Sequence, residues 1–182
     1  MKKTIAILLA AAILALCLSG CGNKKEVEFG AKVHNFIEQA TDSASDILSL
    51  CVVEYQQLQD DGIGAEKMDS DYYKKCANRF TDEGYGNMTT MLTNSNLVDQ
   101  MYQEIMAMNV KAENADGLKD AVQRLYEAHQ KLLARSTNIY GPAEDFLNEC
   151  SGYFADVSGA HSDAVDLLAP YNRKPGYVDL IN

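Results

Sequence analysis

Apolar residues recur every three or four positions along most of this chain, the spacing that places them on one face of an α-helix. The first such stripe spans residues 29–58 and consists of Phe29, Val33, Ile37, Ala40, Ala44, Ile47, Cys51, Tyr55 and Leu58. Gly62 and Gly64 follow it, and a glycine just past the last periodic residue is a common helix stop. The spacing therefore predicts a first helix of about 30 residues, roughly 45 Å long.

Three further stripes follow, over residues 88–111, 118–139 and 146–168. Gly141-Pro142 separates the last two so closely that their helices must lie antiparallel, and Pro170 is predicted to end the last helix. Residues 69–80 favour a short additional helix, and the Thr- and Asn-rich residues 89–96 favour a kink or a loop. We therefore predict an all-α fold, an up-down-up-down bundle of four long helices with an extra short helix or kink after the first.

The N-terminus has a different character. Lys2 and Lys3 precede an almost wholly apolar run over residues 4–18, which is the order of an export signal. The run is shorter than the roughly 20 residues that a helix needs to span a bilayer, so a permanent transmembrane helix is the weaker interpretation. It ends in Leu18-Ser19-Gly20-Cys21, which resembles the lipobox of bacterial lipoproteins. The resemblance implies cleavage before Cys21, whose sulfur then carries diacylglycerol, and ordinary secretion is the rival interpretation.

These features divide the chain into a lipoprotein signal peptide (1–20), a polar tether (21–28), a helical bundle (29–170) and a C-terminal tail (171–182). We expect the protein in the bacterial cell envelope, where acylated Cys21 holds it on the outer face of a membrane. Cleavage leaves 162 of the 182 residues, with 14 basic and 26 acidic side chains and a formal net charge of −12. Such acidity argues against a nucleic-acid partner, because phosphate binding requires clustered Lys and Arg.

No motif identifies a reaction or a cofactor. Glu does not stand three residues before His34, His129 or His161, which excludes the Glu-x-x-His pairs of carboxylate-bridged metal bundles. The chain also lacks Cys-x-x-Cys-His, Gly-x-Ser-x-Gly and His-Glu-x-x-His. The acids within residues 60–71 do not match an EF-hand and are interpreted as solvated side chains. We therefore expect no catalytic residue, no metal ligand and no cofactor.

Three cysteines follow Cys21, and export would permit a disulfide among Cys51, Cys76 and Cys150. In an up-down-up-down path, Cys51 and Cys150 lie roughly 12 to 14 Å from the same end of the bundle. They are therefore the preferred pair. Cys76 is a candidate for the same layer, and free thiols in the core are the alternative to any disulfide.

The last helix carries two pairs of small residues, Ser151-Gly152 and Ser158-Gly159, seven positions apart. Glycine inside a helix costs about 1 kcal/mol relative to alanine, so some compensating interaction is expected. We favour the close approach of a neighbouring helix. A small groove for a ligand or partner is the alternative.

The sequence favours a membrane-anchored, non-enzymatic lipoprotein that acts through protein contacts or as a structural accessory. A small-ligand-binding lipoprotein that serves a transporter or sensor is the alternative. Contacts with a protein partner are expected mainly in the tail, at Tyr171, Tyr177, Val178, Leu180 and Ile181. Deletion of the tail is then expected to weaken partner capture and to leave thermal unfolding nearly unchanged.

Overall fold

The computed structural model describes the backbone of residues 2–60 and 87–181. Within these ranges it describes the side chains from residue 24 onward, except those of residues 87, 88 and 179. This part of the chain forms α1 (Lys2–Asp60), α3 (Asn87–Ala107), α4 (Ala115–Ser136) and α5 (Ala143–Asn172), followed by the short 3-10 helix η1 (Val178–Leu180). These described ranges contain no strand, and the prediction of an all-α bundle is confirmed.

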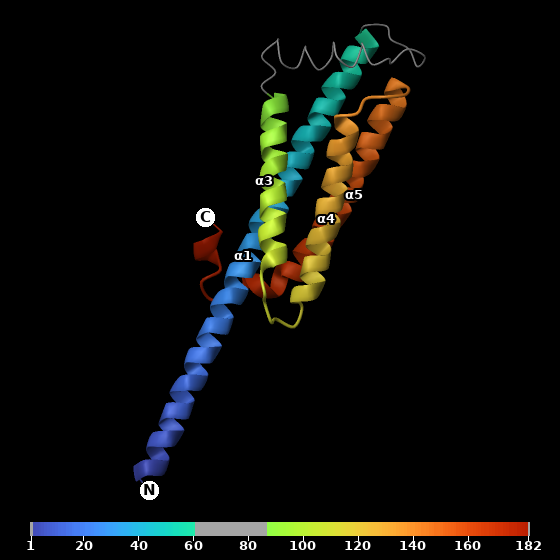
Figure 1. Ribbon diagram of the computed structural model, residues 1–182. Helices are drawn as coiled ribbons and strands as arrows, with labels where there is room; N and C mark the ends of the chain where they lie inside the picture. Colours follow the sequence, from blue (N-terminus) through green and yellow to red (C-terminus); the bar gives the residue numbers. More distant parts are fainter. Residues whose placement is uncertain (1, 61–86, 182) are drawn as a thin grey trace.

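The other helices pack against α1, which contacts α3, α4 and α5 directly. Followed along the sequence colours of Figure 1, α1 and α4 run in one direction and α3 and α5 in the other. The expected short helix or kink falls in residues 61–86, outside the described residues. Residues 89–96, for which a kink or loop was expected, belong to α3, because Met91 and Ser95 are both buried on its inner face.

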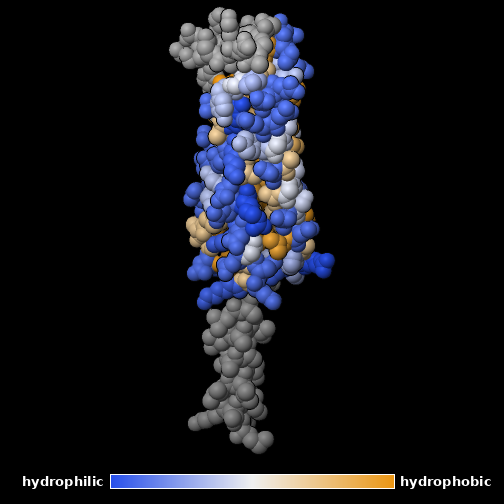
Figure 2. Space-filling view, turned by 90° about the vertical axis from the view of Figure 1, so that its right-hand side faces the viewer, coloured by the Kyte–Doolittle hydropathy of each residue, from blue (hydrophilic) through white to orange (hydrophobic). Residues whose placement is uncertain are grey.

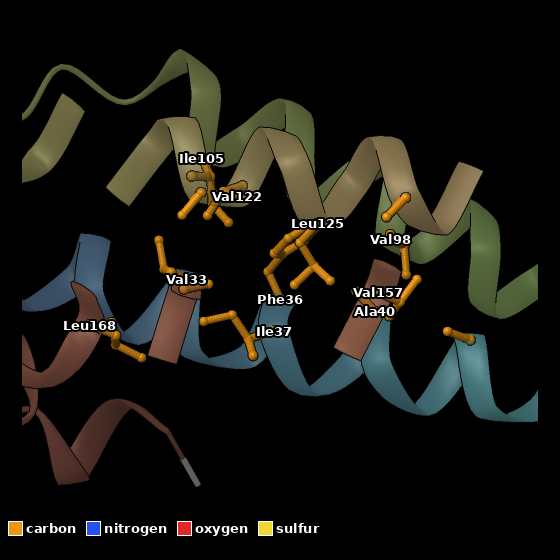
Figure 3. Packing of buried hydrophobic residues seen from close by; sticks show 14 of the residues in the cluster. Val33, Phe36, Ile37, Ala40, Val98, Ile105, Val122, Leu125, Val157 and Leu168 are labelled. Atoms are coloured by element: carbon orange, nitrogen blue, oxygen red, sulfur yellow. The ribbon is translucent and has the colours of Figure 1, made fainter. Parts of the chain in front are cut away.

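All four helices contribute apolar side chains to one shared interior. Figure 3 shows Phe36 and Ile37 of α1, Leu125 of α4 and Val157 of α5 directed toward this interior. The predicted stripe of α4 is buried over most of its length, at Leu118, Ala121, Val122, Leu125, Ala128 and Leu132. Each helix is therefore held mainly by its buried face, since short helices gain little stability from propensity alone.

The connection between α4 and α5 has the local chemistry that the sequence suggests. Gly141 has a φ of 75°, a left-handed conformation that costs glycine little and other residues more. Pro142 follows in an extended conformation at the N-cap, and Glu144 and Asp145 stand in the first turn of α5, where the helix dipole favours negative charge. The turn is short, so α4 and α5 lie side by side.

The structure differs from the sequence-based prediction at the start of the bundle. Residues 21–28, expected as a tether, are helical and belong to α1. Val27 is 5% exposed and is part of the core, and Glu26 forms an ion pair with Lys174 in the tail. The packed part of the protein therefore begins before Phe29.

The second difference is at the end of α5. Pro170 was expected to close this helix, but α5 continues to Asn172. A proline in the last turn removes one backbone hydrogen bond, and the burial of the Tyr171 side chain, which is 1% exposed, offsets that loss. Pro170 is therefore tolerated inside the helix.

Candidate functional site

The main cluster of reactive side chains in the described residues is a pair of thiols. Cys51 of α1 and Cys150 of α5 are free cysteines, 2% and 0% exposed respectively. Each thiol shifts the pKa of the other, so the two lie near each other where α1 packs on α5. The sequence predicts the two residues at one height of the bundle, and in the structure they are close enough to affect each other's pKa. The disulfide stays a prediction.

The guanidinium of Arg135 is the cation beside this pair. Arg135 lies near the end of α4 with a side chain that is 4% exposed, and it forms an ion pair with Glu149. It also donates hydrogen bonds to the carbonyl oxygens of Asn138 (2.6 Å) and Tyr140 (3.0 Å). Because a buried cation without partners would be costly, these contacts explain how the arginine is kept in the interior.

The two thiols differ in acidity. The hydrogen bond from the Cys51 thiol lowers the pKa of Cys150, and the charge of Arg135 acts in the same direction, while burial opposes both. The same hydrogen bond, together with burial, raises the pKa of Cys51. The two thiols therefore titrate as one linked pair, in which ionisation of one disfavours ionisation of the other.

A small cavity adjoins Cys51. Its volume is about 30 Å³, and it is lined by Leu50, Cys51, Glu54, Met91, Ser136, Ile139 and Phe146. This volume has room for about two water molecules. Organic ligands occupy pockets of roughly 300 to 1,000 Å³, so the cavity is too small for one.

Two histidines bind hydroxyl groups across helix interfaces. The Nε2 atom of His129 in α4 is 2.9 Å from the Ser43 hydroxyl of α1, and both residues are 0% exposed. His161 of α5 makes a similar contact with Thr41, again at 2.9 Å. A serine beside a histidine suggests nucleophilic catalysis, but the burial of Ser43 closes its hydroxyl to any substrate. The pair is structural.

Burial also controls the protonation of His129. Removal from water lowers the pKa of His129 to about 4, and the negative charge of Asp99 offsets this only in part. The imidazole is therefore neutral near pH 7. Neutral histidine needs no counter-ion, which suits a residue inside a core.

The tail residues that were predicted as partner contacts are divided by the structure. Tyr171 and Tyr177 are 1% and 2% exposed and pack on α1, where their rings meet Phe29 and His34 edge to face at 5.7 and 6.0 Å. These two tyrosines are not exposed, because the tail folds back along α1.

The apolar residues at the end of the tail are more accessible. Val178 is 63% exposed and Leu180 is 47% exposed, whereas Ile181 is half-buried and packs against the core. The exposed apolar surface of the tail is therefore limited to Val178 and Leu180. Gly176, with a φ of 85°, provides the turn that leads into η1.

The small residues of α5 do not receive a neighbouring helix. Gly152 and Gly159 are exposed, and a Cβ added at either position would have no atom within 4 Å. The favoured interpretation of these pairs as a helix-packing site is therefore wrong. The close approach occurs at Gly30 of α1, where an added Cβ would lie 2.6 Å from the Cβ of Tyr171.

The remaining surface is mainly polar. The face shown in Figure 2 is mostly hydrophilic, with small and separate hydrophobic areas. The larger apolar side chains that are exposed elsewhere in the described residues are Val52, Leu92, Leu97, Tyr140 and Val165. They come from three helices (α1, α3 and α5) and the α4–α5 connection, so they do not form one extended face.

Some sequence-based expectations lie outside what the structure describes. Cys76 and the acids of residues 61–71 fall in the segment 61–86, and the side chain of Cys21 precedes the first described side chain. Within the described residues, no group of three or more His, Cys, Asp or Glu side chains is placed to hold a metal ion. The same part of the chain contains no helix with the length and apolarity needed to cross a membrane.

Comparison with known proteins gives no relative from which a site could be transferred. Neither a family model, nor a curated protein, nor a solved structure matches this chain.

Proposed function

We propose that this protein is a lipid-anchored component of a bacterial cell envelope whose helical bundle acts without catalysis, through protein contacts or as a structural accessory. Its attachment to the bilayer is through acylated Cys21, and its second partner is a protein. The support for the anchor is the order of residues 2–21, in which two lysines, an apolar run and Leu18-Ser19-Gly20-Cys21 follow one another.

The observation that carries the non-enzymatic part of the proposal is the filled interior. The side chains of four helices fill the core, and the pocket beside Cys51 has a volume of only about 30 Å³. In the part of the chain that the structure describes, the hydroxyl–histidine pair with both members buried, Ser43 and His129, is sealed from solvent. A protein with a filled core can recognise a partner through its outer surface. Exposed apolar side chains are the best candidates for such contacts.

Val178 and Leu180 are the candidates for that role. Both are exposed, and both stand in η1 beside α1. Burial of an exposed valine or leucine in a partner pocket stabilises a complex by roughly 1.5 to 3 kcal/mol. Two such residues and their polar surroundings suit a modest, membrane-confined interaction.

The anchor is tested by metabolic labelling with a fatty-acid analogue in a bacterial host. We expect label on the wild-type chain in the membrane fraction, and loss of label and release from the membrane in Cys21→Ser. Cys17→Ser is the matched control, because residue 17 would be removed with the signal peptide and the label should remain. Unlabelled wild-type protein in the membrane would contradict the anchor.

The contact surface is tested by placing a photoreactive amino acid at position 178 or 180 in the anchored protein. We expect a discrete crosslinked product at both positions. Val165 of α5 is the matched control, because it is an exposed apolar residue (42%) on another element. Equal products at all three positions would contradict a tail-centred contact. Saturable binding of a small metabolite by the purified chain would instead favour the ligand-binding alternative.

A further inference from the structure

The end of the bundle nearest Cys21 contains a cleft whose lysines have no assigned role. It has a volume of about 220 Å³ and is lined by Lys25, Glu26, Asn109, Val110 and Lys111. The first two of these residues belong to α1, and the other three belong to the connection between α3 and α4. Figure 1 shows this connection at the end of the bundle where α1 enters it. The cleft therefore lies at the end that the proposed anchor would hold toward the bilayer.

The charge that the cleft offers to a ligand is positive. Lys25 and Lys111 are exposed, and neither takes part in an ion pair with another residue that the structure describes. The carboxylate of Glu26 is already paired with the ammonium group of Lys174. Asn109 is exposed as well, and its side-chain amide is a hydrogen-bond donor. The lining therefore presents two ammonium groups and an amide, with its carboxylate neutralised.

The charge of the chain is unevenly distributed about this end. Residues 24–28, 108–116 and 171–181 form this end, and they contain five basic and five acidic residues. The rest of the chain from Cys21 onward contains nine basic and 21 acidic residues, so it carries the whole formal net charge of −12. A negatively charged bilayer repels this acidic remainder but not the balanced end. The bundle is therefore expected to stand upright on such a surface.

The anchor would hold the cleft at the depth of the lipid phosphates. Lys25 follows Cys21 by four residues, about 6 Å of helix. The polar headgroup region of a bilayer is roughly 5 to 8 Å deep on each side. Acyl chains on Cys21 would therefore keep Lys25 at the level of the headgroups. Lys111 would be at a similar level, because it lines the same cleft.

The size and the chemistry of the cleft suit a single phosphate group. Pockets for whole organic ligands begin at roughly 300 Å³, and this cleft is smaller. A phosphodiester is an anion with acceptor oxygens, which matches a lining of ammonium and amide donors. Phosphates of a nucleic acid would also meet the acidic remainder of the chain, whereas a lipid headgroup meets this end alone.

We propose that the cleft between the start of α1 and the α3–α4 connection binds the phosphate of an anionic membrane phospholipid through Lys25 and Lys111. The amide of Asn109 is a further donor to this phosphate. The binding rests on the proposed function, since the anchor brings the cleft to the bilayer. It fixes how the anchored bundle stands, with the α4–α5 connection at the end that faces away from the membrane.

The test uses the full chain incorporated into vesicles of equal parts phosphatidylcholine and phosphatidylglycerol. A photoreactive amino acid replaces Asn109, so that both lysines stay in place. We expect lipid adducts at position 109 that are strongly enriched in phosphatidylglycerol. Lys25→Gln and Lys111→Gln should each lower this enrichment by about fivefold, and the double variant should remove it.

Lys131→Gln is the matched control. Lys131 is also an exposed lysine, but it lies sixteen residues after Ala115, about 24 Å along α4 from the first residue of that helix. This variant should leave the enrichment unchanged. All three lysines are exposed, so none of the substitutions should alter thermal unfolding.

Three results would overturn the proposal. They are the absence of a lipid adduct at position 109, an adduct without preference for phosphatidylglycerol, and an enrichment that survives in the double variant. Loss of the adduct on addition of millimolar inorganic phosphate would assign the cleft to a soluble anion and would also overturn it.

Fatty-acid labelling of the same protein separates the cleft from the anchor. A lysine-dependent adduct on a chain without label at Cys21 would support the cleft and count against the anchor. A labelled chain without a selective adduct would support the anchor and overturn the cleft.

Discussion

The docking of the tail on α1 can be tested with a single methyl group. Gly30 faces Tyr171, and a Cβ added at position 30 would lie 2.6 Å from the Tyr171 Cβ and 3.0 Å from its Cγ and Cδ1 atoms. Ordinary contacts begin at 3.4 Å. The nearest atom is bonded to the α5 backbone rather than at the end of a flexible side chain, so Gly30→Ala must displace the end of α5.

The size of the effect follows from two opposing terms. Overpacking of a core costs about 1 to 3 kcal/mol, and the short distance to a backbone-linked atom places this case at the upper end. Replacement of a helical glycine by alanine returns about 1 kcal/mol. We therefore expect Gly30→Ala to lower the free energy of unfolding by about 2 kcal/mol, or the Tm by about 4 to 8 °C.

Gly159→Ala is the matched control, because Gly159 is helical, exposed and without any atom within 4 Å of an added Cβ. Only the propensity term applies there, so this variant should be more stable by about 1 kcal/mol. Thermal unfolding followed by the helical circular dichroism signal measures both. If Gly30→Ala were as stabilising as Gly159→Ala, the packing of Tyr171 on α1 would be refuted.

Three further predictions concern the tail, the buried histidine and a surface ion pair. Deletion of residues 171–182 should lower the free energy of unfolding in urea by at least about 3 kcal/mol, because Tyr171 and Tyr177 are both buried. An unchanged urea midpoint would instead support the exposed tail that the sequence predicts. The pKa of His129 falls to about 4 in the folded state, from about 6.5 in the unfolded state. Between these pH values only the unfolded state binds the proton. The free energy of unfolding should therefore decline by about 3 kcal/mol as pH drops from 6.5 to 4. His129→Gln should flatten that slope, and an unaltered slope would assign it to other groups. Lys32→Ala should lower the free energy of unfolding by less than about 1 kcal/mol, because the side chains of the 2.6 Å ion pair with Glu104 are 38% and 61% exposed. A larger loss of stability that persists in high salt would contradict this.

The helices were predictable because their apolar spacing is regular. Ile47 and Leu125 stand in the stripes read from the sequence, and both are 0% exposed. Burial of a stripe is a local property of one helix, so one sequence suffices to find it. The relation between helices is not local. The sequence therefore left open which surface the tail would meet, and the space at Gly30 that admits Tyr171 was visible only in the structure.

The polar residues of the core were missed for a related reason. Three buried polar residues stand at positions of the apolar stripes. They are Glu54, three residues after Cys51, His129, four after Leu125, and Arg135, three after Leu132. Position alone was therefore a usable signal. The reason for their burial was not readable, because the partners of Arg135 include backbone carbonyl oxygens in the α4–α5 connection.

The proposed anchor and the buried thiols lie at different heights of one helix. Cys21 precedes Val27 by six residues, about 9 Å of helix, so acyl chains on Cys21 would hold the start of the packed bundle close to the bilayer. The tail docks at this same end, through Glu26 with Lys174 and Gly30 with Tyr171. Cys51 lies 30 residues beyond Cys21, about 45 Å along α1, where α1 still packs against α5. The tail contact thus belongs to the end of the bundle near the anchor, and the buried thiols lie toward the far end. Val178 and Leu180 stand at the end near the bilayer, so a partner that reaches them must itself lie at the membrane.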